Sequence, residues 1–205
     1  MRAVTIARCF SSVAIPKEAS ITRKLLLEQV PLVETPSFEF LRSLSSTISD
    51  LVYSNLVEKG STTESLLIGA NNGLSLICQN VLNSNWERVS SLSTPYLAST
   101  LAEERPSLPP SLESALSFSP EDVVHSFVYR SFFTGRVFKV ADEGNTFIYY
   151  LIVSYIRRSD QVPFGLSPAQ YLSKHRDQLT IGNVGFARAV NPPGKWRIAH
   201  LNMSL

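Results

Sequence analysis

Cysteine is scarce in this 205-residue sequence, and long apolar runs are missing. Two cysteines, Cys9 and Cys78, are too few for the disulfide framework of a small secreted domain. The longest unbroken apolar run, residues 147–153, is far shorter than the ~20 residues that a membrane-spanning helix needs. The sequence therefore excludes a disulfide scaffold and predicts no membrane-spanning helix.

An excess of charge of one sign is also missing. The chain has 19 Lys and Arg residues against 17 Asp and Glu residues. Two of the arginines, Arg2 and Arg8, lie in the leader described below, and their removal leaves 17 residues of each sign. A chain without net positive charge has no electrostatic reason to bind nucleic acid, so nucleic acid is not expected as a partner.

The motifs of common enzyme and cofactor sites are missing as well. There is no phosphate-binding glycine loop, His-Glu-x-x-His, Cys-x-x-Cys or Gly-x-Ser-x-Gly. The histidines His125, His175 and His200 have no second ligand at metal spacing. We therefore expect no catalytic, cofactor-binding or metal-binding residues. One alternative stays open, a small-molecule isomerase or dehydratase that would use His125 with Asp122, or His200, in a pocket between helices and sheet.

The beginning of the chain has the composition of a mitochondrial presequence. Two arginines are the only charges in residues 1–15, and the first acidic residue follows at position 18. An acid-poor, amphipathic segment with Arg and Ser is typical of such leaders, whereas Arg8 interrupts the apolar stretch that a secretory signal needs. We expect residues 1–10 to be a presequence that is cleaved near Phe10 and Ser11. The expected location is the mitochondrial matrix, peripheral to the inner membrane if the protein binds there.

Apolar residues recur at steps of three and four in the first half of the remaining chain, which predicts amphipathic helices. The segments with this spacing are residues 38–59, 61–83, 86–92 and the turns that follow Pro95. Ser61 and Glu64 have the spacing of a capping box at the start of the second helix. Residues 103–110 contain three prolines and are expected to form a loop.

The second half of the chain has the alternation and composition of β-strands. The expected strands are residues 121–133, 136–141, 145–157, 179–190 and 195–204. A short helix is expected at residues 168–174, because Pro168 suits the first helical position. Helices followed by consecutive antiparallel strands predict an α+β fold with N-terminal helices on one face of a curved sheet, like a cystatin or nuclear-transport-factor cone. This domain would span residues 37–205, after a proline-containing N-terminal arm of residues 11–36.

Residues 147–156 are apolar or aromatic on both of their alternating faces. Such a strand is either covered on both sides or presents one face to a partner. For the second case, the candidate polypeptide-binding residues are Tyr149, Leu151, Val153, Tyr155 and Trp196. Arg157 and Arg158 follow the strand and could instead contact anionic lipid of the inner membrane.

Several motifs occur in an order that resembles a known mitochondrial domain. The matching segments are residues 66–81, the Asn-Trp-Glu-Arg segment from position 85, residues 119–124, the Asp-Glu-Gly turn at 142–144 and the closing Lys-Trp-Arg-Ile-Ala-His of 195–200. Together they resemble the C-terminal domain of the import-motor scaffold subunit of the inner-membrane translocase. The same domain occurs in a large-subunit mitoribosomal protein and in a protein that interacts with the m-AAA protease. The Asp-Glu-Gly turn and the ending after the Trp strand most resemble the last of these, and the long charged coil of the motor subunit is absent.

This resemblance implies a non-enzymatic matrix adaptor or chaperone-like protein. It would bind the m-AAA protease and a newly imported inner-membrane client, which the resemblance implies is the regulator subunit of the calcium uniporter, and support the maturation and sorting of that client. The resemblance implies no catalytic residues and no cofactor. The ribosomal member of the family leaves a second expectation open, a module that docks on the mitoribosome or the inner membrane.

Overall fold

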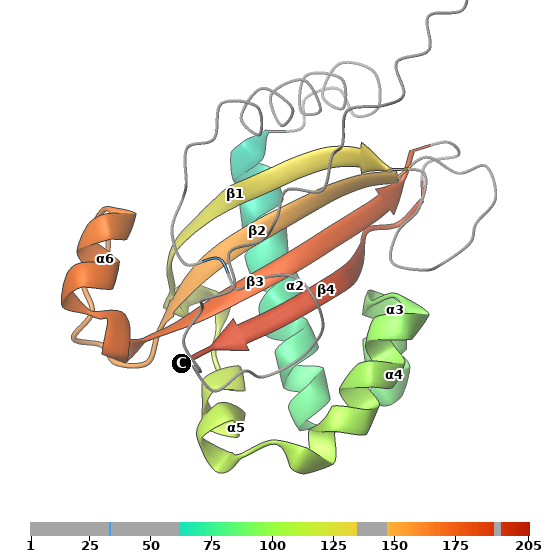
Figure 1. Cartoon of the computed structure of the whole chain (residues 1–205), viewed down its shortest axis with the longest axis horizontal. Coiled ribbons are helices and arrows are strands. Elements are labelled where there is room, and N and C mark those ends of the chain that lie inside the picture. Colours follow the sequence, from blue (N-terminus) through green and yellow to red (C-terminus); the bar gives the residue numbers. More distant parts are fainter. Residues whose placement is uncertain (1–32, 34–61, 135–146, 191–193) are drawn as a thin grey trace, which may run out of the picture.

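The computed structural model describes residues 33, 62–134, 147–190 and 194–205, and these residues form helices and one antiparallel sheet (Figure 1). The helices are α2 (Thr63–Leu82), α3 (Trp86–Leu92), α4 (Pro95–Glu104), α5 (Pro110–Leu116) and α6 (Pro168–Lys174). The strands are β1 (Val123–Thr134), β2 (Phe147–Arg157), β3 (Leu179–Ala189) and β4 (Arg197–Ser204). The expected presequence with its cleavage site at Phe10 and Ser11, the arm apart from Val33, the helix at 38–59 and the strand at 136–141 lie outside the described residues.

The four strands follow one another in space in the order β1-β2-β3-β4, and each neighbouring pair is antiparallel. β2 and β3 are therefore the two inner strands of this sheet. The register pairs Val153 of β2 with Asn183 of β3, and Asn183 in turn with Asn202 of β4. The helices precede the strands in the chain, apart from α6, so the α+β class predicted from the sequence is confirmed.

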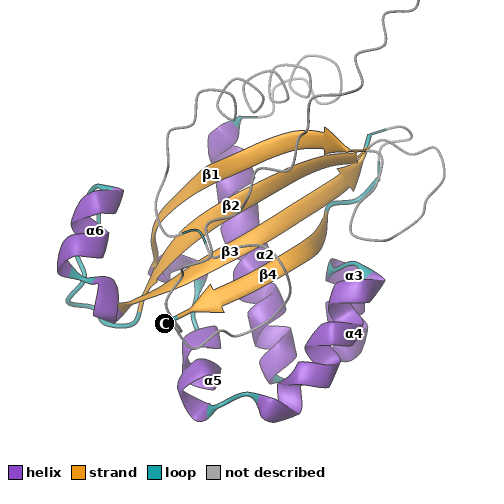
Figure 2. Cartoon of the chain, viewed as in Figure 1, coloured by secondary structure: helices purple, strands orange, loops and turns teal. Residues whose placement is uncertain are grey.

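The long helix α2 crosses one face of the sheet, with α3, α4 and α5 beside its C-terminal half (Figure 2). Its N-cap is Thr62, whose hydroxyl accepts from the backbone N–H of Ser65 at 3.1 Å, while the Ser65 hydroxyl accepts from the N–H of Thr62. The capping box predicted at Ser61 and Glu64 is therefore wrong by one residue. A serine can replace the usual Glu or Gln at the third position because its hydroxyl also reaches back to the cap.

The buried stripe of α2 is the one that the spacing predicts. Ala70, Leu74, Ile77, Cys78 and Val81 all face the core, together with apolar residues of α3, α4, α5 and the strands. Burial of this kind stabilises by roughly 25 cal/mol per Å² of apolar surface removed from water. The helix therefore owes its position to packing more than to its own sequence propensity. Desolvation in this core raises the pKa of the Cys78 thiol to about 12.

One polar side chain of α2 lies within this helix–sheet interface. The amide of Asn71 donates to the hydroxyl of Ser126 on β1 at 3.1 Å, and its oxygen accepts from the hydroxyl of Ser154 on β2 at 2.9 Å. Ser154 is fully buried, so these bonds satisfy groups that water does not reach. The pairing fixes where α2 lies along the sheet.

The loop predicted at residues 103–110 is only partly a loop. Helix α4 continues to Glu104, and the short helix α5 begins at Pro110, which occupies a first-turn position that needs no N–H. Arg105, between them, donates to the carbonyls of Val81 and Leu82 at the end of α2 and pairs with Glu113 of α5. The prolines begin a helix here rather than excluding one, and a single arginine joins three helix ends.

The helices of the described residues do not include one that is long and apolar enough to cross a membrane.

Candidate polypeptide-binding face

The pleat of β2 sends alternate side chains to opposite faces of the sheet. Ile148, Tyr150, Ile152 and Ile156 belong to the core beneath α2, and we call this side the helix face. Tyr149, Leu151, Val153 and Tyr155 point the other way and belong to two separate apolar clusters. We call the side that carries these four residues the far face. It is the face that the sequence offers as a binding surface.

Of the two readings of this strand, the one with these four side chains on an exposed surface does not hold. Tyr149 and Leu151 are 4% and 5% exposed, and Val153 and Tyr155 are fully buried. Apart from its two end residues, β2 is buried along its whole length on both faces. The uninterrupted apolar sequence of the strand therefore reports an inner strand covered on both sides, which was the alternative reading.

Trp196, the fifth candidate, does not lie with the other four. Its ring packs against Tyr150 on the helix face, with ring centroids 5.9 Å apart. The guanidinium of Arg188 lies 5.8 Å from the same indole ring. Trp196 is half-buried and contacts the core beneath α2, so it is a packing residue of the opposite side.

The chain between β2 and β3 packs on one end of the far face. Val162 and Tyr171 of this connection are buried with Val153 and Tyr155 in one apolar cluster. The hydroxyl of Tyr171 donates to the carbonyl of Pro163 at 3.0 Å and lies 3.3 Å from that of Val124. Its ring meets Tyr155 edge-on at 6.1 Å between centroids. α6 thus lies at this end of the far face and packs against it through Tyr171, and Figure 1 shows the helix at its left side.

Val33 of the N-terminal arm also lies on the far face. Its side chain is buried and belongs to the cluster that contains Val153, Tyr155 and Ile181. Its backbone is held by Asn183 of β3: the N–H of Val33 donates to Oδ1 of Asn183 at 3.0 Å, and Nδ2 of Asn183 donates to the Val33 carbonyl at 3.1 Å. The two residues are 150 positions apart in the chain. The far face therefore binds the backbone of a residue from a distant part of the chain.

The Asn183 side chain forms the same two kinds of hydrogen bond with Val33 that a residue of a neighbouring strand forms in an antiparallel pair. Such residues exchange both an N–H···O and an O···H–N bond with their partner. A carboxamide has the same donor and acceptor as a peptide group, so it can complete both bonds of one residue. Asn183 is fully buried and sits on an inner strand of the sheet. A buried carboxamide without such bonds would be costly, so this site requires a partner with both a donor and an acceptor, which the backbone of Val33 supplies.

Other polar side chains lie near Asn183 on β4. His200, Asn202 and Ser204 are each no more than 5% exposed. His200 pairs in the register with Gly185, over which the hydroxyl of Tyr149 lies so closely that a Cβ there would be 2.0 Å from the oxygen. Burial lowers the pKa of His200 to about 4, so its imidazole is neutral at physiological pH. The buried imidazole therefore adds no charge to this row of polar side chains.

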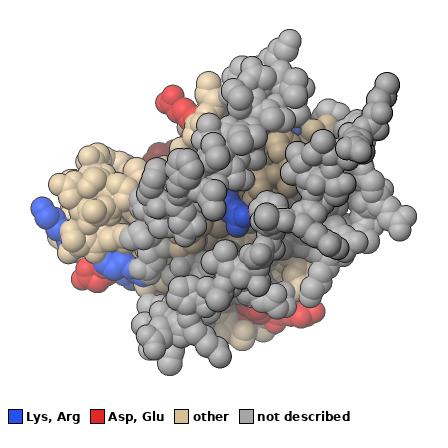
Figure 3. Space-filling model, turned by 45° about the horizontal axis from the view of Figure 1, so that its top comes forward, with Lys and Arg blue, Asp and Glu red and all other residues tan. Residues whose placement is uncertain are grey.

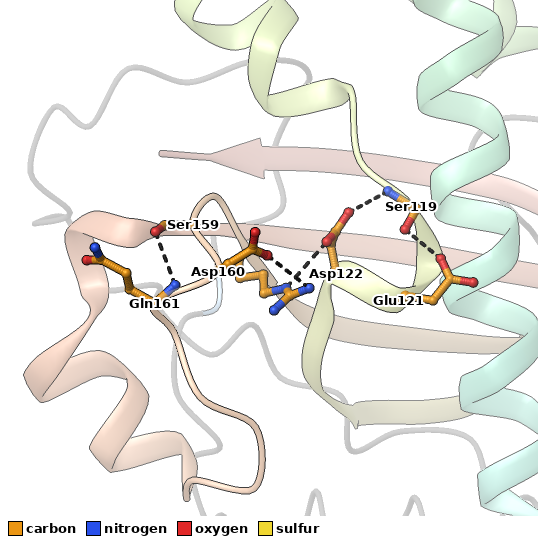
Figure 4. A network of polar contacts seen from close by, with 7 residues as sticks. Ser119, Glu121, Asp122, Ser159, Asp160 and Gln161 are labelled. Atoms are coloured by element: carbon orange, nitrogen blue, oxygen red, sulfur yellow. Dashed lines mark hydrogen bonds and ion pairs between the residues drawn. The ribbon is translucent and has the colours of Figure 1, made fainter.

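The residues of the enzyme alternative are not brought together. His125 on β1 packs against the rings of Phe127, Tyr155 and Tyr171. Asp122 directs its two oxygens elsewhere, one accepting from the N–H of Ser119 at 2.9 Å and the other from Arg157 at 3.4 Å (Figure 4).

His200 is also distant from His125. It lies on β4 at the opposite edge of the sheet from β1. Three strand spacings, about 14 Å, lie between them across the sheet, and His200 is also four residues away from the row Tyr155, Ile181 and Ser204 that lies opposite His125. No group of His, Cys, Asp or Glu side chains in the described part of the chain could hold a metal ion.

The two arginines after β2 are engaged in local contacts. Arg157 pairs with Asp122 and, at 3.2 Å, with Asp160, and its guanidinium lies 4.9 Å from the ring centre of Phe164. Arg158 donates to the backbone carbonyl of Asp177. Basic and acidic atoms lie side by side at the α6 end of the molecule in Figure 3. The described residues of this region therefore carry charges of both signs, and Arg158 keeps its charge because its partner is a neutral carbonyl.

Sequence reasoning missed both Asn183 and Val33. The available signal was a single asparagine in a strand, residues 179–189, that is otherwise mostly apolar or small. A buried polar residue inside an apolar strand indicates a specific partner. The identity of that partner could not be read from the sequence, because it lies 150 positions away.

The protein class that these features define is an α+β domain whose sheet is covered by helices on one face and contacts Val33, a residue distant in the chain, on the other. Comparisons with known proteins give no more specific assignment: no protein-family model matches this chain, and no curated protein matches it.

Proposed function

We propose that this protein is a non-enzymatic, polypeptide-binding adaptor or chaperone-like protein of the mitochondrial matrix. The observation that carries the proposal is the pair of hydrogen bonds between the Asn183 side chain and the backbone of Val33. The valine side chain is buried in the apolar cluster of the far face. A site that recognises a peptide backbone can accept many sequences, which suits a protein that handles unfolded clients.

The location and partners of the proposal rest on the sequence. The acid-poor leader with a cleavage site near Phe10 and Ser11 supports import into the matrix. The motif order of residues 61–205 supports membership of the import-motor domain family, on the branch that interacts with the m-AAA protease. The proposed partners are accordingly that protease and a newly imported inner-membrane protein, such as the regulator subunit of the calcium uniporter. The proposed activity is to hold this client during its maturation and sorting.

Site-specific crosslinking in mitochondria tests the proposal. A photo-crosslinking amino acid replaces Phe127, a half-buried residue that packs against the Tyr155 cluster of the far face. A matched control carries the same probe at Ile68, which is 57% exposed on α2 and therefore lies on the other side of the molecule. We expect the Phe127 probe, but not the Ile68 probe, to yield adducts with an m-AAA subunit or with a radiolabelled imported inner-membrane protein.

Two results would contradict the proposal. One is the failure of the Phe127 probe to form either adduct in mitochondria that import and process the client normally. The other is the same set of adducts from Phe127 and Ile68, because contact without a preferred face is not binding at the far face.

Neither alternative gains a specific observation from the structure. Docking on the inner membrane would use the basic residues after β2, and of these Arg157 is already paired with Asp122 and Asp160. Small-molecule catalysis would need a paired acid and base, but Asp122 is bonded to Ser119 and Arg157, and His200 lies on a different edge of the sheet from His125.

A further inference from the structure

The contacts of Val33 define what the far face recognises. Two of them, to Asn183, use only backbone atoms of the bound segment. For one residue to offer its N–H and its carbonyl to the same carboxamide, both groups must point to the same side, as they do in an extended chain. The ligand class is therefore an extended peptide, not a helix, because a helix uses these groups within itself.

The apolar cluster around Val33 sets the side-chain requirement. Val153, Tyr155 and Ile181 of the sheet, together with Val162 and Tyr171 from the connection at its end, are buried with it. All of them are uncharged, and Tyr171 directs its hydroxyl to backbone carbonyls of its own surroundings. A charged side chain in this position would lose its hydration without gaining a partner. The position therefore selects an aliphatic side chain of about the size of valine.

We infer that this cluster and Asn183 form a binding site for an extended aliphatic peptide segment, and that Val33 occupies the site in cis. This inference rests on the proposed function and adds its specificity and its regulation. A client segment must displace Val33 before Asn183 can bind it. An occupant tethered to the same chain is present at an effective concentration on the order of millimolar, so it competes strongly with a free peptide.

Peptide binding to the purified full-length chain tests the inference. The probe is a fluorescein-labelled peptide with the sequence of residues 29–37, measured by fluorescence anisotropy. Val33→Asp empties the site, because the aspartate cannot enter the apolar cluster. We expect this variant to bind the probe at least about tenfold more tightly than the wild-type chain. A probe peptide in which aspartate replaces the central valine should not bind either protein.

Two second substitutions in the Val33→Asp chain separate the site from the rest of the molecule. Asn183→Ala removes both backbone contacts and should weaken probe binding about tenfold or more. Asn71→Ala removes a half-buried carboxamide of the helix face instead and should leave the affinity for the probe unchanged. Thermal melts establish that each variant is folded, and Val33→Gly replaces Val33→Asp if the aspartate prevents folding.

The inference is overturned if the wild-type and Val33→Asp chains bind the probe equally, or if Asn183→Ala and Asn71→Ala have the same effect. Its failure is distinguishable from failure of the proposed function. If the wild-type and Val33→Asp chains bind the probe equally but Phe127 still gives specific adducts in mitochondria, the adaptor role is supported and competition by Val33 is ruled out. If the variants bind the probe with the expected order of affinities but the Phe127 adducts are missing, the binding site is supported and the proposed role in mitochondria is not.

Discussion

The two faces of the sheet are buried to a similar degree and by different means. The helix face is covered by α2, α3, α4 and α5, which contribute to one large apolar cluster. The far face has two smaller clusters, α6 at one end, and Val33 from the N-terminal arm. Both faces contain an asparagine with specific hydrogen bonds, half-buried at Asn71 and fully buried at Asn183. Asn71 of the helix face bonds to two side chains, whereas Asn183 of the far face bonds to a main chain.

This difference separates a structural face from a binding face. A contact between two fixed side chains specifies one arrangement of helix and sheet, because both partners are set by the sequence. A contact to a main chain is available to any extended segment. The helix face should therefore respond to substitution mainly through the stability of the whole fold, and the far face mainly through occupancy of the site.

The largest expected effect is a cavity in the helix face. Leu74 is fully buried at the centre of the α2 stripe, so Leu74→Ala should lower the free energy of unfolding by about 3–5 kcal/mol. Val33→Ala, on the far face, should cost about 2 kcal/mol or less, since it deletes a smaller side chain at the edge of a smaller cluster. Urea unfolding followed by circular dichroism measures both. Equal losses would contradict the division between the faces.

The next effect concerns the pH dependence of the far face. His200 has a folded pKa of about 4 against an ordinary value of 6.5, because it is buried. The unfolded chain therefore binds a proton between these values that the folded chain does not bind. Stability should be complete above about pH 6.5 and fall as the pH is lowered toward 4, by up to about 3 kcal/mol.

Unfolding in urea at pH 7.5 and at pH 5 measures this loss. His200→Gln should reduce the difference between the two pH values, since glutamine does not titrate. A variant that retains the whole pH dependence would show that His200 is not its origin.

A smaller effect is expected from a methyl group added to Gly185. A Cβ at this position would meet the hydroxyl oxygen of Tyr149 at 2.0 Å, so Gly185→Ala must displace the ring. Overpacking of this kind costs about 1–3 kcal/mol. Gly69 on α2 is the matched control, because a Cβ there meets nothing within 4 Å and alanine favours the helix by up to about 1 kcal/mol. Thermal unfolding should show opposite shifts for the two variants, and a destabilised Gly69→Ala would contradict the comparison.

The smallest expected change is chemical and leaves stability untouched. Burial raises the pKa of Cys78 to about 12, so its thiol is neither ionised nor accessible at pH 8. In a Cys9→Ser background, iodoacetamide should not modify the folded chain, and modification should begin only when denaturant unfolds it. Mass spectrometry measures the labelling. Rapid labelling of Cys78 without denaturant would show that the helix face opens in the native state.

The helix face and the order of elements could be predicted from the sequence, because they follow from local rules. The spacing of Leu74, Ile77 and Val81 predicts the buried stripe of α2, and Pro168 predicts the start of α6. The start of α5 at Pro110 was missed because proline was interpreted as a helix breaker. At the first helical position it is a helix starter, and the two roles are told apart by the residues that follow.

The candidate site could not be predicted in the same way, because it depends on contacts that are distant in the chain. The apolar faces of β2 were recognised, but alternation alone does not say whether a face such as that of Tyr149 and Leu151 is covered. The backbone of Val33 has no sequence signature for a partner at Asn183. Trp196 was a candidate as an aromatic residue, without an assignment to either face, and it packs against Tyr150 on the helix face.

The most direct test of the central claim is the hydrogen exchange of one backbone amide. If the far face binds the main chain of the arm, the N–H of Val33 is bonded to Asn183 and shielded from water. We expect NMR to show slow exchange of the Val33 amide in the wild-type protein. Asn183→Ala should accelerate it by an order of magnitude or more, and Asn71→Ala should leave it unchanged. Exchange of the Val33 amide at the rate of an unstructured peptide in the wild-type protein would contradict the account.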